Sequence, residues 1–232
     1  MKKFIISLLT VLLLLSATTV FALPYLQLDI VDGVYDPLTE TTVATSQNFT
    51  LQALVDPRSP RYVQDADYYL SIAVYPGIGQ TNPAPNLGLF TVDGNPIQVA
   101  GDMTWGTPPV LHATGADLPG HGVFPTYFTE LPFQIDPSSM IAAYDVQTGD
   151  AAGPPGHQLY LFDFDIDRSL LDPSVILHFD LYTFNARDGI IFAPFSHDAQ
   201  SHSAPVPEPG TLLLLGAGLA MAGACSRRRD RR

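Results

Sequence analysis

Apolar and polar residues alternate with a period of two along five stretches of the chain. These stretches are 48–56, 67–75, 127–135, 158–167 and 175–184. In 158–167, for example, Phe162 and Phe164 alternate with aspartates. Successive side chains of a strand point to opposite faces, so each stretch predicts a strand with one buried face. A shorter apolar run at 25–31 predicts another strand before them.

Proline and glycine gather between the predicted strands. The segments 75–88, 101–122 and 148–156 hold most of them, which predicts turns and long loops. Asp32-Gly33 and Asp93-Gly94 have the composition of hairpin turns. Sustained helical spacing is absent between the two ends of the sequence. The pattern therefore predicts an all-β fold, a single β-sandwich of immunoglobulin-like or jelly-roll-like form with long Gly/Pro-rich loops.

The first 22 residues have the three parts of a secretory signal peptide. Lys2 and Lys3 precede an apolar run at 4–15, and mostly small residues follow as far as Ala22. This order predicts export, with cleavage between Ala22 and Leu23. A retained N-terminal anchor is the alternative.

Three unlike segments follow one another at the other end of the sequence. They are Val206, Pro207, Glu208 and Pro209, then the uncharged residues 211–225, then five arginines within 227–232. The prolines lack N–H donors and oppose a helix, whereas 211–225 predicts one short transmembrane helix. At ~1.5 Å per residue it spans roughly 22 Å, less than a hydrocarbon core of ~30 Å. The arginines predict that the tail is cytoplasmic and that the preceding residues lie outside.

Together, residues 205–232 resemble a PEP-CTERM sorting signal, a tag found on exported proteins of many Gram-negative bacteria. The resemblance implies that an exosortase, a membrane protease with transpeptidase-like chemistry, removes the tail near 207–209. It also implies transient residence in the inner membrane, followed by delivery to the cell surface or the medium. A plain single-span anchor is the alternative. Both ends are then processing segments, and residues 23–204 form the ectodomain.

Four phrases of this ectodomain resemble the choice-of-anchor N proteins, exported bacterial proteins that combine one ectodomain with interchangeable C-terminal anchors. The phrases are LPYLQL at 23–28, HGVFPTY at 121–127, FDLYT at 179–183 and FAPFSHDA at 192–199. The resemblance implies a surface protein of undefined role. It supplies no catalytic or ligand-binding residue.

The ectodomain is strongly acidic. Residues 23–204 contain 21 Asp and Glu, four Arg and no Lys, for a formal charge of −17. Such a charge repels nucleic acid and anionic lipid, so nucleic acid is not expected as a partner. Solubility and weak affinity for divalent cations are expected instead. The single cysteine, Cys225, lies in the tail, so the ectodomain is predicted to fold without disulfides.

Asp163, Asp165 and Asp167 are weak candidate calcium ligands. They share one face of a predicted strand at spacings of roughly 7 Å, where carboxylates repel at low ionic strength. An EF-hand is excluded, because other residues occupy its glycine and glutamate positions. An exposed acidic strand face accounts for the pattern without an ion. A cation shared with Asp65 or Asp67 is the alternative.

Ser196, His197 and Asp198 contain the residue types of a hydrolase triad. Side chains of adjacent residues diverge, whereas the histidine of a triad lies between its two partners, so a polar loop is the preferred interpretation. The six histidines show no zinc-site spacing, and His178 is predicted to lie on the solvated side of its strand. Trp105 and several tyrosines could form an aromatic face for sugar rings.

These observations favour a non-enzymatic exported protein with a structural or adhesive role at the cell surface or in a biofilm matrix. Its expected partners are the exosortase, the export machinery and, through the C-terminal helix, the membrane, with exopolysaccharide as the extracellular partner. No cofactor is expected apart from a possible calcium ion. A calcium-assisted carbohydrate-binding module and a secreted hydrolase are the alternatives.

Overall fold

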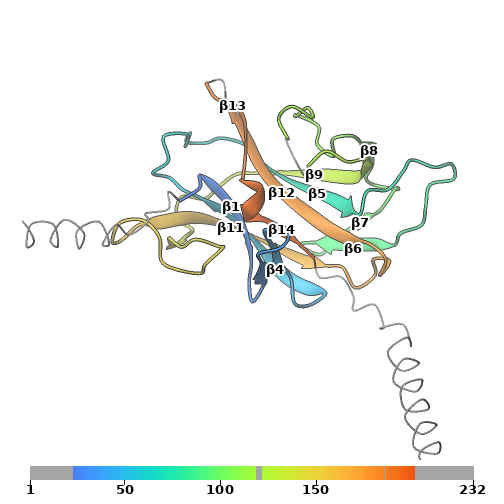
Figure 1. The fold of residues 1–232 in the computed structure, drawn as a ribbon, viewed down its shortest axis with the longest axis horizontal. Coiled ribbons are helices and arrows are strands. Elements are labelled where there is room, and N and C mark those ends of the chain that lie inside the picture. The colour runs from blue at the N-terminus through green and yellow to red at the C-terminus, as the bar shows by residue number, and fades with distance from the viewer. Residues whose placement is uncertain (1–22, 119–121, 186, 202–232) are drawn as a thin grey trace, which may run out of the picture.

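The computed structural model describes residues 23–118, 122–185 and 187–201, which form two stacked β-sheets (Figure 1). The predicted signal peptide to Ala22, the sorting motif and the predicted helix 211–225 lie outside the described residues. The only helical element that the structure describes is a 3-10 turn, η1 (Phe195–His197). No helix in the described ranges is long and apolar enough to cross a membrane. The prediction of an all-β fold is confirmed.

The first sheet has six strands. Their order is β1-β4-β11-β6-β7, with β10 beside β11. The strands are β1 (Leu26–Ile30), β4 (Asn48–Val55), β6 (Leu89–Val92), β7 (Asn95–Gln98), β10 (Met140–Ala142) and β11 (Gln158–Asp167). All pairings are antiparallel.

The second sheet has eight strands. Their order is β2-β3-β14-β12-β5-β9-β8, with β13 beside β12. The strands are β2 (Val34–Asp36), β3 (Thr41–Val43), β5 (Tyr68–Tyr75), β8 (Thr104–Gly106), β9 (Thr126–Phe133), β12 (Ile176–Asn185), β13 (Gly189–Phe192) and β14 (Asp198–Gln200). The β3–β14 pair is parallel. Figure 1 shows the long strands β5, β9 and β12 running side by side.

The six strands predicted from the hydrophobic pattern are β1, β4, β5, β9, β11 and β12, each within two residues of its expected bounds. The alternation of side chains explains the core. Phe164 and Ile166 of β11 and Leu177 and Phe179 of β12 are buried in one apolar cluster between the sheets. Fully burying one such side chain contributes about 1.5–3 kcal/mol. A second cluster on the outer face of the first sheet includes Leu54 and Leu159, and Leu23 packs against it.

Of the two predicted hairpin turns, the structure confirms Asp93-Gly94, and the prediction for Asp32-Gly33 is wrong. Asp93-Gly94 joins β6 to β7, with Val92 paired to Asn95 and positive φ at both turn residues, as a type I′ turn requires. Asp32-Gly33 instead carries the chain from β1 in the first sheet to β2 in the second sheet. This Asp-Gly pair thus lies in a connection between the two sheets and not in a hairpin, because β1 pairs with β4 and not with β2.

Candidate functional site

His178 and Asp180 lie on the outer face of the second sheet, since Leu177 and Phe179 occupy the core side of β12. They are nevertheless buried, each 7% exposed. Thr39, which precedes β3, and Phe124, which precedes β9, line a cavity together with His178. The prediction that His178 is solvated is therefore wrong, because segments distant in sequence cover this part of the sheet face.

The pairing of β12 with β14 brings Asp198 to the same place. His178 Nε2 lies 3.6 Å from Asp180 Oδ1 and 3.6 Å from Asp198 Oδ2. The Asp198 side chain is only 2% exposed. We name these three residues the buried His–Asp cluster. In the part of the chain that the structure describes, it is the one group of three or more His, Cys, Asp or Glu whose ligand atoms lie within 4.8 Å of one another.

The charge state of this cluster follows from its two carboxylates. Burial alone lowers the pKa of His178, but Asp180 and Asp198 outweigh burial and raise that pKa to about 9. With no other cation bound, the imidazole is therefore protonated at neutral pH. Asp180 and Asp198 therefore stabilise positive charge at the position of His178.

A cavity of about 230 Å³ adjoins the cluster. It is lined by Thr39, Thr41, Tyr75, Phe124, His178 and Gln200. Two of these residues are the strand neighbours of the cluster, since Thr41 pairs with Asp198 and Gln200 pairs with His178. Through His178, the cluster thus borders a space whose other lining residues are threonine, glutamine and aromatic residues.

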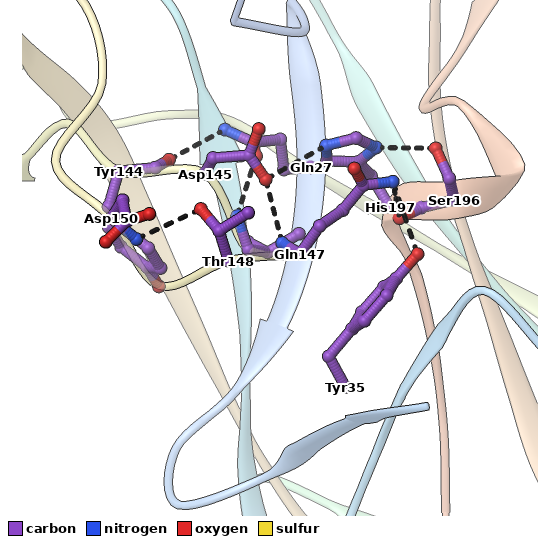
Figure 2. Close-up of polar contacts among 10 residues, drawn as sticks. Gln27, Tyr35, Tyr144, Asp145, Gln147, Thr148, Asp150, Ser196 and His197 are labelled. Carbon is purple, nitrogen blue, oxygen red and sulfur yellow. Dashed lines mark hydrogen bonds and ion pairs between the residues drawn. The ribbon is translucent and has the colours of Figure 1, made fainter. Parts of the chain in front are cut away.

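Figure 2 shows a separate polar network around His197. Ser196 Oγ lies 2.9 Å from Nδ1 of its neighbour His197, and Asp145 Oδ1 lies 3.8 Å from His197 Nε2. The second distance exceeds a hydrogen bond. Burial lowers the pKa of His197, and Asp145 partly offsets this effect. Asp198, the third residue type of the apparent triad, belongs to the buried His–Asp cluster instead.

The same network joins two distant loops. Gln147 Nε2 donates to the Ser196 carbonyl over 3.3 Å and to the Tyr35 hydroxyl over 3.2 Å (Figure 2). Gln147 N donates to Asp145 Oδ1 over 2.8 Å. These contacts attach the loop after β10 to the segment before β14. The interpretation of 196–198 as a polar loop is wrong, since Ser196 and His197 lie in η1 and Asp198 begins β14.

The candidate calcium ligands Asp163, Asp165 and Asp167 follow the outer face of β11. Their register partners on β4 are the neutral residues Gln52, Thr50 and Asn48. Gln52 Nε2 donates to Asp163 over 2.9 Å, and Thr50 Oγ1 donates to Asp165 over 3.0 Å. Asp67, a suggested fourth ligand, accepts from Gln134 over 3.2 Å. Cross-strand donors thus relieve part of the repulsion, and calcium binding stays a prediction.

The predicted aromatic face is divided between two environments. Tyr68 is buried in the core, and Trp105 donates from Nε1 to the Ile78 carbonyl over 2.9 Å. On the outer face of the second sheet, Tyr69 stacks on Tyr182 with ring centroids 5.1 Å apart and on Phe184 at 6.0 Å. We name Tyr69, His112, Tyr182 and Phe184 the aromatic ridge. Its Phe184 is 47% exposed.

The sequence contained one signal of the buried cluster. His178 and Asp180 are two residues apart in a predicted strand, so they share a face. Asp198 joins them through the pairing of β14 with β12, which no local pattern reveals.

Comparison with known proteins gives a match for the tail. Residues 205–229 match the family model of the PEP-CTERM protein-sorting motif. No curated protein and no solved structure matches the chain. The motif indicates an exosortase substrate, exported in Gram-negative bacteria, attached to the membrane and then processed. The match does not extend to residues 23–204, whose resemblance to the choice-of-anchor N proteins stays a prediction.

Proposed function

We propose that this exported protein has a non-enzymatic structural or adhesive role at the cell surface or in the biofilm matrix, with exopolysaccharide as its partner. The observation that carries the proposal is the sorting motif at 205–229, joined to an acidic β-sandwich. The resemblance of residues 23–204 to the choice-of-anchor N proteins points to the same kind of surface protein.

The aromatic ridge supports the choice of polysaccharide as partner. Tyr69 and Phe184 are nearly parallel, with 20° between their ring planes, and Phe184 is exposed. Aromatic rings offer a flat apolar surface against which the C–H face of a sugar ring packs. A neutral polymer also avoids repulsion by an ectodomain with a formal charge of −17. The Asp163–Asp167 face gives calcium-assisted binding less support, because its carboxylates already accept cross-strand hydrogen bonds.

The experiment measures, in the producing bacterium, the fraction of the protein that the extracellular polysaccharide retains. We expect Phe184→Ala to weaken retention roughly two- to twelvefold, which corresponds to the loss of about 0.5–1.5 kcal/mol of ring contact. Phe195→Ala removes another exposed phenylalanine, one that is not a member of the ridge, and is the matched control. Deletion of residues 207–209 should block processing and release, which tests delivery separately.

Two outcomes would contradict the proposal. If the protein stays in place after enzymatic removal of the polysaccharide, polysaccharide is not its partner. If Phe184→Ala and Phe195→Ala are retained like the unmodified protein, the ridge is not the contact surface.

A further inference from the structure

We propose that His178, Asp180 and Asp198 bind one divalent transition-metal ion, for which zinc is the appropriate probe, with a coordination position open toward the adjoining cavity. The donor set is one imidazole nitrogen and two carboxylate oxygens. Zinc and related first-row ions accept this combination, whereas calcium and magnesium favour oxygen ligands alone.

The separations between the donor atoms favour a metal ion over direct hydrogen bonds. His178 Nε2 is 3.6 Å from a carboxylate oxygen of each aspartate, beyond the ~2.7–3.2 Å of a hydrogen bond. Ligands at about 2.0–2.2 Å from a tetrahedral zinc ion lie about 3.3–3.6 Å apart. A histidine that simply bonds an aspartate in this protein is closer, since His157 Nε2 lies 2.8 Å from Asp56 Oδ1.

Charge and burial favour the ion as well. Removing two carboxylates from water is costly unless opposite charge compensates them. A divalent ion with a neutral imidazole and two carboxylates brings the net charge to zero.

The cavity supplies the open position. Zinc sites with three protein ligands keep the fourth position for water or another small ligand, as catalytic zinc sites do, whereas closed structural sites use four protein ligands. The cavity of about 230 Å³ borders His178, and its other lining residues include Thr39, Thr41 and Gln200. A water molecule occupies about 30 Å³ of liquid volume, so the space admits metal-bound water or a small oxygen ligand.

The test uses the full-length chain, purified in detergent and treated with a chelator. Titration with Zn²⁺ should show one saturable site, and Zn²⁺ should raise the melting temperature. Co²⁺ in the same site should give the intense visible absorption of a four-coordinate ion. His178→Gln and Asp198→Asn should each weaken Zn²⁺ binding at least about 100-fold and abolish the shift in melting temperature.

His112→Gln is the matched control, because His112 Nε2 lies 3.9 Å from a Glu130 oxygen but belongs to no three-ligand group among the described residues. It should leave Zn²⁺ affinity unchanged. If His178→Gln fails to fold, Asp198→Asn and Asp180→Asn, which keep side-chain shape, decide the question. The proposal is overturned if the unmodified chain shows no saturable Zn²⁺ binding at micromolar concentration. Equal binding by His178→Gln and the unmodified chain would also overturn it, since it would assign the ion to the acidic surface.

Discussion

At the scale of single residues, two features require glycine at position 153: its backbone conformation and the closeness of a histidine ring. Its φ is +76°, and a Cβ at this position would collide with Nδ1 of His157. His157 Nε2 lies 2.8 Å from Asp56 Oδ1, which also accepts from the Arg58 backbone N–H over 2.8 Å. The contact joins the loop after β10 to the turn after β4. Gly153 therefore permits a buried polar contact between loops that are distant in sequence.

We predict that Gly153→Ala lowers the free energy of unfolding by about 1–3 kcal/mol more than Gly149→Ala does. Gly149 also has a positive φ, of +70°, but a Cβ there meets open space. Both variants thus carry the strain of a left-handed backbone, and only Gly153→Ala displaces the His157 ring. Urea denaturation of the two variants measures the difference. Equal urea midpoints for the two variants would show that the His157–Asp56 contact contributes little to the free energy of unfolding.

Residue-scale prediction from sequence succeeded where neighbours along the strand decide the outcome and failed where distant segments do. Alternation placed Asp163 and Asp165 on an exposed face, and both are exposed. The same alternation placed His178 on the outer face correctly, but it could not show that the segments carrying Thr39 and Phe124 bury that position.

At the scale of elements, long strands were predictable and short ones were not. An eight- or ten-residue strand such as β4 or β11 contains several repeats of the alternation, so its period is visible. Strands of three residues, such as β3 and β14, contain too few residues to show any period. They exist because neighbouring strands offer hydrogen-bonding partners, and β14 is the element that supplies Asp198 to the buried His–Asp cluster.

Three neighbouring strands of the first sheet give an element-scale prediction. Gln52 of β4 stands between Asp29 of β1 and Asp163 of β11 in the strand register. Burial raises the pKa of Asp29, while hydrogen bonds from Tyr144 and Ile30 partly offset this effect. Gln52→Glu would place three carboxylates in one row. We predict a loss of roughly 0.5–1 kcal/mol of stability at low ionic strength, which salt reduces.

Gln52→Met is the control for this prediction. It removes the hydrogen bond to Asp163 without adding charge, so its effect should depend little on salt. The free energy of unfolding of both variants is measured at low and at physiological ionic strength. If the two variants respond to salt alike, charge repulsion along the row is negligible.

At the scale of the whole molecule, the chain order of strands differs from their order in the sheets. The strand β12 pairs with β5, β13 and β14. The strands β1 and β2, by contrast, follow each other in the sequence but belong to different sheets. Periodicity predicts that strands form and which face is buried, but it carries no information on which strands pair. A two-sheet sandwich was therefore predictable from the sequence, whereas the meeting of β12 with β14 was not.

The acidity of the ectodomain gives a prediction for the molecule as a whole. A formal charge of −17 within residues 23–204 produces repulsion that opposes the compact state. Raising ionic strength from about 0.01 M to 0.15 M shortens the screening length from about 30 Å to 8 Å. We expect NaCl to raise the melting temperature over this range by a few degrees, roughly 2–4 °C for each kcal/mol of repulsion removed.

Measuring the same protein in CaCl₂ at equal ionic strength separates screening from specific binding. Equal shifts in the two salts would assign the effect to screening and count against a calcium site at Asp163, Asp165 and Asp167. A larger shift in CaCl₂ that the Asp165→Asn variant loses would place calcium on that face, because Asp165 is the middle carboxylate of the three. A melting temperature that stays constant or falls as NaCl increases would show that the acidic side chains do not destabilise the fold.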